Sequence, residues 1–311
     1  MVHRTQVDLT SDDFQTLENV TVASIGVFDG LHKGHRMLVE TMKRERDKRN
    51  SSGHICMITF SDHPRGVLCG TPPTRLLHPE IKTAILKEWG VDVVVEMKTD
   101  TELLELSADE FCSRIKKIIN PEMIIVGENF RFGKGRLGDT ALLAQSTGAE
   151  VLPLKMVEGE DNQFVSATAV REYLAAGDVK TANGCLGRPY SVLGTKITGD
   201  KIGRKMGSST INLEPTPDAL PDGVYAVTAN GHRAVSHLGP RPTFDSNERR
   251  FEVHILGTTE LQSKDDNDVW EIEFHAYLRD VADFENTDEL RAQIAKDIQA
   301  ATDIFENEAQ S

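Results

Sequence analysis

The sequence has few cysteines, no long hydrophobic run and an excess of acidic side chains, and each feature argues against a class of protein. Its apolar stretches fall well short of the roughly 20 residues that a membrane-spanning helix needs, and the N-terminal residues lack the apolar core of a signal peptide. The four cysteines show no short paired spacing, which argues against a zinc knuckle or a disulfide framework. We therefore expect reduced thiols in a cytoplasmic protein that is not attached to a membrane.

The charge balance argues against one class of binding partner, nucleic acids. Lys and Arg number 35 against 49 Asp and Glu, and the formal net charge is -14. Because nonspecific binding to nucleic acid depends on neutralising many phosphates with Lys and Arg, we expect no nucleic-acid partner. A small anionic substrate in a local pocket is compatible with this charge. The oligomeric state stays open.

The first part of the chain has the pattern of an α/β domain. A length of 311 residues corresponds to about two domains. Between about residues 20 and 185, β-branched segments alternate with helical ones, so we expect a Rossmann-like, doubly wound parallel sheet. Ser107 followed by Glu110 predicts a capping box at the start of one helix. The expected strands are 20–26, 54–60, 91–97 and 122–127, and the expected helices are 35–49, 79–90 and 108–119.

The second part has a different rhythm, and we place the boundary so that the domains are 1–186 and 187–311. Short strands separated by Gly, Pro and Asp, with no helices between them, predict an antiparallel β-barrel or sandwich. They are expected at 192–200, 223–229, 232–239, 251–256 and 270–278. A final helix is expected at 287–305, with Thr287 as its N-cap. Its apolar face would consist of Leu290, Ile294, Ile298 and Ala301.

The stretch "GVFDGLHKGH", residues 26–35, lies where the first strand gives way to a helix. A glycine-rich turn at such a place brings backbone N–H groups and the helix N-terminus to a phosphate. His32 and His35 would face the same anion, and Gly34 would let the backbone between them approach it. Two ordinary surface histidines are the alternative. The candidate phosphate-binding residues here are Gly26, Phe28, Asp29, Gly30 and Gly34.

This stretch resembles the His-x-Gly-His signature of the nucleotidyltransferases and, more specifically, the N-terminal module of the bacterial bifunctional riboflavin kinase/FAD synthetases. "ITFSDHPRGVL" and "VGENFRFGKGRLGD" are similar to two further motifs of that family. The resemblance implies that His63, Phe130 and Phe132 line the flavin pocket. It also implies that Asn129 holds a nucleotide or flavin phosphate, as a catalytic residue beside His32 and His35. On physical grounds alone, the two phenylalanines are as easily core residues.

"VSATAVREYL" resembles the family motif that closes over the ATP phosphates, with Ser166, Thr168 and Arg171 retained and Ala167 in place of a serine. The implied reaction joins FMN to the adenylyl group of ATP: the FMN phosphate attacks the α-phosphorus, pyrophosphate leaves, and Mg²⁺ offsets charge.

The second part resembles riboflavin kinase modules, which implies ATP and riboflavin as further substrates. The resemblance makes Glu252 the general base that takes the proton of the ribityl 5′-hydroxyl. It makes Thr210 and Asn212 ligands of Mg²⁺, and it places Arg279 at the flavin. The glycine loop over the ATP phosphates would consist of Gly199, Gly203 and Gly207.

Three departures from the kinase pattern keep a second hypothesis open. Ser208 and Ser209 replace Phe-Pro, His237 stands where the family usually has asparagine, and a longer polar stretch replaces Asp-Leu-Tyr-Gly. The leading hypothesis is an enzyme with both activities. The alternative is an FAD synthetase with an impaired or repurposed kinase-like domain. A flavin- or nucleotide-binding regulator without turnover and a transferase for another small phosphorylated alcohol are further alternatives.

Overall fold

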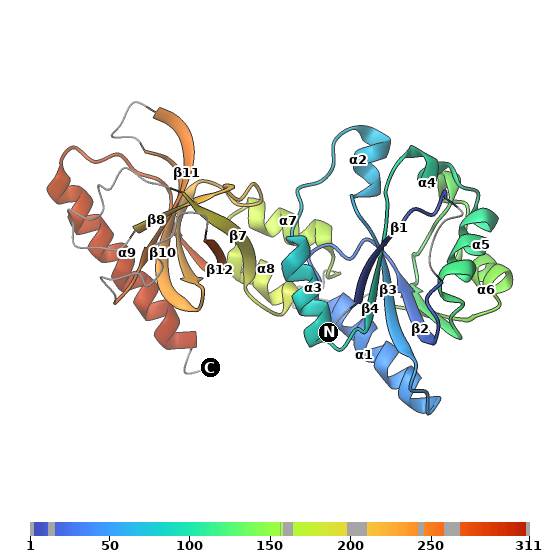
Figure 1. Ribbon diagram of the computed structural model, residues 1–311. Helices are drawn as coiled ribbons and strands as arrows, with labels where there is room; N and C mark the ends of the chain where they lie inside the picture. The colour runs from blue at the N-terminus through green and yellow to red at the C-terminus, as the bar shows by residue number, and fades with distance from the viewer. Residues whose placement is uncertain are drawn as a thin grey trace. The chain divides into compact units, whose positions relative to one another are not determined.

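The computed structural model describes residues 3–11, 16–155, 157, 164–197, 210–241, 246–257 and 268–308, without the side chains of 241 and 246–248. The chain forms two compact units, Met1–Ala167 and Thr168–Ser311 (Figure 1). Contacts within the chain thus group residues 168–186 with the second unit. The functional boundary after residue 186 stays a prediction.

The first unit is built on a six-stranded parallel sheet, which confirms the expected fold. In sheet order, the strands are β1 (His3–Val7), β4 (Val93–Met97), β3 (His54–Phe60), β2 (Val20–Ile25), β5 (Met123–Gly127) and β6 (Glu150–Leu154). The four central strands are nearly continuous runs of buried side chains, as in sheets covered on both faces, and they lie where the sequence predicts them. The sequence pattern does not predict the two edge strands, β1 and β6, which are more exposed.

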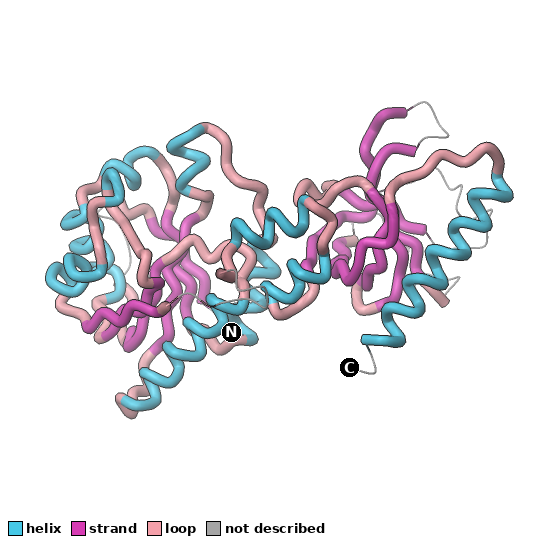
Figure 2. The backbone as a smooth tube through the Cα atoms, turned by 180° about the vertical axis from the view of Figure 1, so that it is seen from behind, coloured by secondary structure: helices cyan, strands magenta, loops and turns pink. Residues whose placement is uncertain are grey.

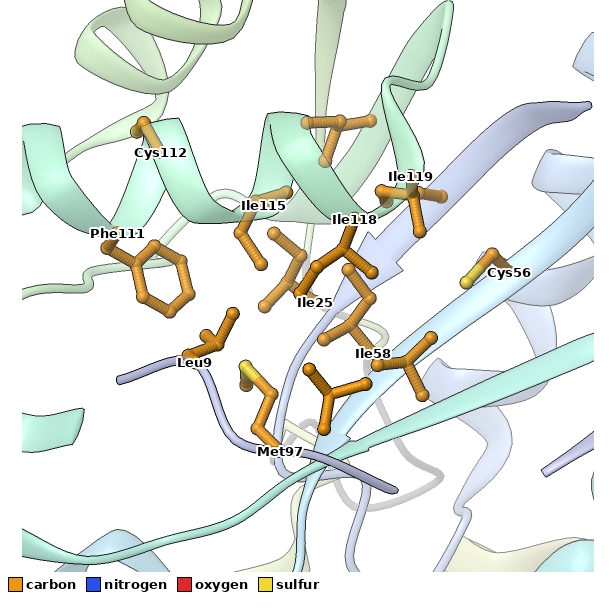
Figure 3. Packing of buried hydrophobic residues seen from close by; sticks show 14 of the residues in the cluster. Leu9, Ile25, Cys56, Ile58, Met97, Phe111, Cys112, Ile115, Ile118 and Ile119 are labelled. Atoms are coloured by element: carbon orange, nitrogen blue, oxygen red, sulfur yellow. The ribbon is translucent and has the colours of Figure 1, made fainter. Parts of the chain in front are cut away.

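Helices cover both faces of this sheet (Figure 1). The helices of this unit are α1 (Lys33–Lys48), α2 (Pro64–Cys69), α3 (Pro79–Glu88), α4 (Thr101–Glu105), α5 (Ala108–Ile119) and α6 (Thr140–Thr147), with a 3₁₀ turn, η1, at Lys134–Arg136. On one face, Ile115 of α5 packs with Ile25 and Ile58 of the strands (Figure 3). The predicted capping box is confirmed. Ser107 Oγ accepts the N–H of Glu110 at 3.2 Å, and Glu110 Oε2 accepts the N–H of Ser107 at 2.9 Å.

The strand order reverses between β2 and β5. The chain moves from β2 to β3 and β4 on one side, and then to β5 and β6 on the other. In open α/β sheets, ligands bind outside the carboxyl ends of the strands at such a switch point. The segment with His32 and His35 follows β2, and the segment with Asn129 follows β5. The fold therefore brings these two candidate segments to the same edge of the sheet.

The second unit contains a closed, six-stranded antiparallel barrel, which decides between the barrel and the sandwich. Its elements are α7 (Ala167–Ala175), α8 (Val179–Leu186), β7 (Tyr190–Ile197), β8 (Thr210–Glu214), β9 (Gly223–Ala229), β10 (His232–Arg241), β11 (Ser246–Ile255), β12 (Val269–Arg279) and α9 (Thr287–Glu308). Around the barrel the strand order is β10-β11-β8-β7-β12-β9. The large side chains of Tyr225, Phe251 and Phe274 are fully buried in it, and the ring of Phe274 contacts the rings of both Tyr225 and Phe251.

The final helix, α9, lies along the outside of the barrel (Figure 2). Ala301 and Phe305 are buried in one cluster with Val224 of β9 and Val235 of β10. The helix is where the sequence predicts it, but Thr287 as its N-cap is wrong by one residue. Asn286 Oδ1 accepts the N–H groups of Asp288 and Glu289, at 3.1 and 2.9 Å, so Asn286 is the cap and Thr287 is the first helical residue. Both residue types can cap a helix, and asparagine is the more strongly preferred one.

Candidate active sites

The loop after β2 brings two imidazoles together at the start of α1. His32 is the residue before the helix, and His35 lies in its first turn. Their rings stack, with centroids 3.7 Å apart and planes at 23°. The ring of Phe28 meets His35 edge-on at 5.2 Å. The structure therefore places side by side the two histidines that the sequence predicts to face one anion.

The backbone of this loop is tightly constrained. A Cβ on Gly34 would lie 3.1 Å from two ring atoms of His32, so a larger residue there would displace the imidazole. Gly30 has φ of +74° and adopts the left-handed conformation that glycine favours. Phe28 and Leu31 adopt it as well, at φ of +49° and +45°, which side chains rarely do. Both of these side chains are buried, which fixes the loop on either side of Gly30.

The charge state of His35 is set by its surroundings. Burial lowers its pKa well below the ordinary value, and the nearby His32 and Lys82 lower it further. These surroundings favour the neutral form of the imidazole. Within the described part of the chain, its Nδ1 is shielded from solvent and makes no hydrogen bond. Negative phosphate charge brought next to this ring would favour its protonated form, so the imidazole can gain positive charge as an anion binds.

Lys82 is a polar residue of this site that the sequence analysis misses. It reaches from α3, and its Nζ donates to Thr59 Oγ1 at 2.8 Å and to the carbonyl of Val27 at 3.1 Å. The sequence feature that could identify this residue is a lysine placed one turn before Leu86, on the buried side of an amphipathic helix. Asp29, two residues after Val27, is held by a hydrogen bond, because its Oδ1 accepts the N–H of Leu76 at 3.2 Å.

The segment after β5 carries an exposed Asn129, followed by two aromatic rings. Phe130 is half-buried and stacks on Phe132, with centroids 5.5 Å apart. Phe132 packs on Phe111 at 5.2 Å in the hydrophobic core. Phe132 is thus a core residue. The roles of Asn129 at a phosphate and of both phenylalanines at a flavin stay predictions.

The remaining predicted residues of the nucleotidyltransferase module lie at the start of α2 and at the start and in the middle of α7. His63 caps α2, because its Nδ1 accepts the N–H of Arg65 at 3.1 Å. Ser166 directly precedes α7, which carries Thr168 and Arg171. Ser166 belongs to the first unit and the other two to the second. Their placement at the ATP phosphates, and that of His63 at the flavin, stay predictions.

In the barrel, strand register brings candidate residues into one row. Asn212 of β8 lies directly opposite Glu252 of β11, and Glu252 lies opposite His237 of β10. Thr210 lies opposite His254 in the next row of the same face. Side chains at directly opposite positions have Cβ atoms about 5 Å apart. The structure therefore gathers Thr210, Asn212 and Glu252, which the resemblance assigns to metal binding and proton transfer.

Burial along these strands agrees with that arrangement. Along β8, the half-buried Thr210 and Asn212 alternate with the buried Ile211 and Leu213, as expected for strand side chains that point to opposite faces. His254 is a further polar member of the face that the sequence analysis misses. Burial lowers the pKa of His254.

Arg279 forms an ion pair inside the second unit. Its Nε and Nη2 donate to the two carboxylate oxygens of Asp297 on α9, at 2.9 and 2.7 Å. Its guanidinium also lies 5.9 Å from the ring centroid of Phe284. This pair joins the end of β12 to α9, and flavin binding by Arg279 stays a prediction. The loop glycines Gly199, Gly203 and Gly207 lie outside the described residues.

The described residues show neither a membrane span nor a cluster of metal ligands. None of their helices is long and apolar enough to cross a bilayer. They also contain no group of three or more His, Cys, Asp and Glu side chains that could hold a metal ion.

Comparison with known proteins agrees with both halves of this description. The FAD synthetase family model matches residues 14–169, and the riboflavin kinase family model matches residues 186–305. The chain is 33% identical over 296 residues to the bifunctional riboflavin kinase/FMN adenylyltransferase of Escherichia coli K12, which covers 91% of this chain and 92% of that protein. Its counterpart in Listeria monocytogenes is 29% identical over 96% of both chains.

A similar solved structure is described as a macrolide-efflux protein from Streptococcus pneumoniae. It matches with a TM-score of 0.83 and 26% identity over 97% of this chain and 99% of that one. Two family matches in tandem and near full-length relatives lead to one assignment. The chain belongs to the family of bifunctional riboflavin kinase/FMN adenylyltransferases.

Proposed function

We propose that this chain makes flavin cofactors in two ATP-dependent steps, phosphorylation of riboflavin to FMN and adenylylation of FMN to FAD. The observation that carries the proposal is that each half of the chain gathers its own candidate polar residues, the stacked histidines at the start of α1 and the Asn212–Glu252 row of the barrel. Each set lies in the half of the chain whose family has the matching activity.

In the adenylylation step, an oxygen of the FMN phosphate attacks the α-phosphorus of ATP in line. The bond from that phosphorus to the oxygen bridging it to the β-phosphate breaks, and pyrophosphate leaves. His32 and His35 hydrogen-bond the phosphates and stabilise the charge that develops in the transition state. The N–H groups at the start of α1 add favourable potential for the anion. Supporting phosphate contacts come from the glycine-rich turn, with Gly26, Phe28, Asp29, Gly30 and Gly34. The resemblance to the family adds Asn129, Ser166, Thr168 and Arg171.

In the kinase step, Glu252 accepts the proton of the ribityl 5′-hydroxyl while that oxygen attacks the γ-phosphorus of ATP, and ADP leaves. A general base must reach the proton it abstracts, and a half-buried carboxylate in a strand can be held at such a position. This step requires riboflavin to bind against the same face of β8 and β11.

Mg²⁺ is part of the proposal, and the residues present fit it. Thr210 and Asn212 offer a hydroxyl and an amide oxygen on one face of β8, beside the carboxylate of Glu252. Such hard oxygen donors suit Mg²⁺, which proteins usually hold through one or two ligands plus substrate phosphates. When bound, the ion neutralises charge on the nucleotide phosphates. A cytoplasmic location and the absence of a nucleic-acid partner remain predictions.

The test is one assay in two tubes. Purified protein with ATP and MgCl₂ receives riboflavin in one and FMN in the other, and flavins are separated by chromatography. The proposal expects FMN and FAD in the first tube and FAD in the second. No flavin product in either, despite flavin or nucleotide binding, would overturn it and favour a regulator.

The second candidate, an FAD synthetase with a changed kinase-like domain, is favoured by one position in the barrel row. His237, opposite Glu252, stands where riboflavin kinases usually have asparagine. FAD from FMN without FMN from riboflavin would select this candidate. Restoration of FMN formation by His237→Asn would then identify the position responsible.

A further inference from the structure

Lys82 joins the loop of the two histidines to the sheet below it. Its Nζ donates to Val27, the residue before Phe28, and to the hydroxyl of Thr59 on β3. That hydroxyl in turn donates to the same Val27 carbonyl at 2.9 Å. Thr59 is buried and Lys82 is half-buried, so these hydrogen bonds are partly shielded from solvent. The carbonyl therefore has two donors that come from elements distant in sequence.

The loop beyond Val27 needs such an anchor. Phe28 and Leu31 both have positive φ, a strained conformation for residues with side chains that persists only where the surroundings enforce it. Hydrophobic burial of Phe28 and Leu31 holds the far part of the loop. The Lys82–Thr59 pair holds its beginning, where the chain leaves the sheet.

The ammonium group also contributes charge. Burial lowers the pKa of Lys82 to about 8, with Arg75 and Arg4 acting in the same direction and Asp29 and Glu96 opposing them. The same charge is one of the causes that lower the pKa of His35. A bound triphosphate would reverse this balance, since negative charge favours the charged forms of both groups. Lys82 thus lies within electrostatic reach of the imidazole that meets the phosphates.

We propose that Lys82 is a positioning residue of adenylyl transfer, which fixes the loop of His32 and His35 through Val27 and Thr59 and supplies a buried positive charge to the triphosphate site. The proposal rests on the function proposed above for the first unit and adds a residue to it. Lys82 acts through the loop and through the field at the phosphates, and forms no bond to the reacting atoms.

The decisive comparison is Lys82→Met against Lys87→Met in the full chain. Lys87 lies on the same helix but is exposed, so its replacement is a matched control. We expect Lys82→Met to lower kcat for FAD formation from FMN about 100-fold, as expected when reacting groups are misplaced by about an ångström. FMN formation from riboflavin in the same samples should stay within about twofold of the control, because the barrel carries its own site.

A pH profile separates this role from a merely structural one. In the unaltered protein, kcat/KM for ATP in adenylylation should fall above about pH 8, where the lysine of the free enzyme loses its proton. Lys82→Met should lack this decline, and Lys82→Arg, which stays charged, should shift it upward. A flat alkaline profile in the unaltered protein would overturn the proposal without any variant.

Two further measurements test the anchoring role and the charge role of Lys82 separately. Thr59→Val keeps the ammonium and removes the hydroxyl link, so it should lower FAD formation less than Lys82→Met; an unchanged rate would overturn the anchoring role. Calorimetric titration with ATP should show weaker binding to Lys82→Met than to the control. If the unaltered protein makes no FAD, the proposed function is wrong. Equal ATP binding by Lys82→Met and Lys87→Met would overturn the role of Lys82, whatever the outcome for the proposed function.

Discussion

The two units position their candidate phosphate-binding and catalytic residues by different physical means. In the first unit, His32 and His35 lie on a loop whose shape depends on glycines, buried side chains and the distant Lys82. In the barrel, Asn212 and Glu252 lie within strands, and the hydrogen-bonded ladder alone makes them neighbours. A loop site of the first kind should be sensitive to small backbone changes nearby. A strand site should depend mainly on the identity of the side chains in the row.

His32→Ala gives the largest expected effect and tests whether the two sites are separate. Loss of one preorganised group at the developing phosphate charge should lower FAD formation from FMN about 1000-fold. FMN formation from riboflavin should be unchanged, because Glu252 and its neighbours lie in the other unit. Both rates come from one protein sample, with product separation by chromatography. Equal losses in both would contradict separate sites.

Glu252→Gln is the reciprocal change. The amide keeps the size of the side chain but cannot accept the proton, so riboflavin phosphorylation should fall about 100-fold. FAD formation from supplied FMN should be retained. Glu273→Gln on β12, whose carboxylate accepts a hydrogen bond from Thr228 at 2.6 Å, is a control for a lost strand carboxylate. Undiminished FMN formation in Glu252→Gln would remove this residue from the mechanism.

Gly34→Ala sharpens the comparison at the level of the backbone. The new Cβ would press on His32 at 3.1 Å, so we expect FAD formation to fall about 10-fold through displacement of the ring. Gly184→Ala in α8 is the matched control, because nothing lies within 4 Å of the Cβ it would add. That substitution should preserve both activities and raise stability slightly. Equal FAD rates in the two variants would show that the loop tolerates the added methyl group.

The same contrast explains how much could be predicted from the sequence. The parallel sheet, the capping box at Ser107 and the pairing of the histidines follow from local patterns, and the structure has all three. Alternation within a strand puts Thr210 and Asn212 on one face, as in β8, although the strands expected from the sequence do not include residues 210–214. Residues whose role depends on contacts between distant segments are harder to identify.

Lys82 and the row across the barrel are examples of that limit. Lys82 donates a hydrogen bond to Val27, which is 55 residues away in the sequence, and the local helix pattern does not indicate this acceptor. The opposition of Asn212 and Glu252 depends on strand register, which a sequence without a short connecting turn does not fix. The edge strands β1 and β6 were hard to predict for another reason, because they lack the continuous apolar run of a central strand.

The smallest expected effect concerns the helix that covers the barrel. Asn286→Ala removes the side-chain acceptor for two N–H groups at the start of α9 and should lower the free energy of unfolding by about 1 kcal/mol. For a unit of this size, that corresponds to a shift of about 3 °C in the Tm followed by circular dichroism. Thr287→Ala should change the Tm by much less, because Thr287 already lies inside the helix and is exposed. The reverse order would restore Thr287 as the cap. Since α9 packs outside β9 and β10, whereas Asn212 and Glu252 are held by β8 and β11, neither change should alter FMN formation at a temperature well below the transition.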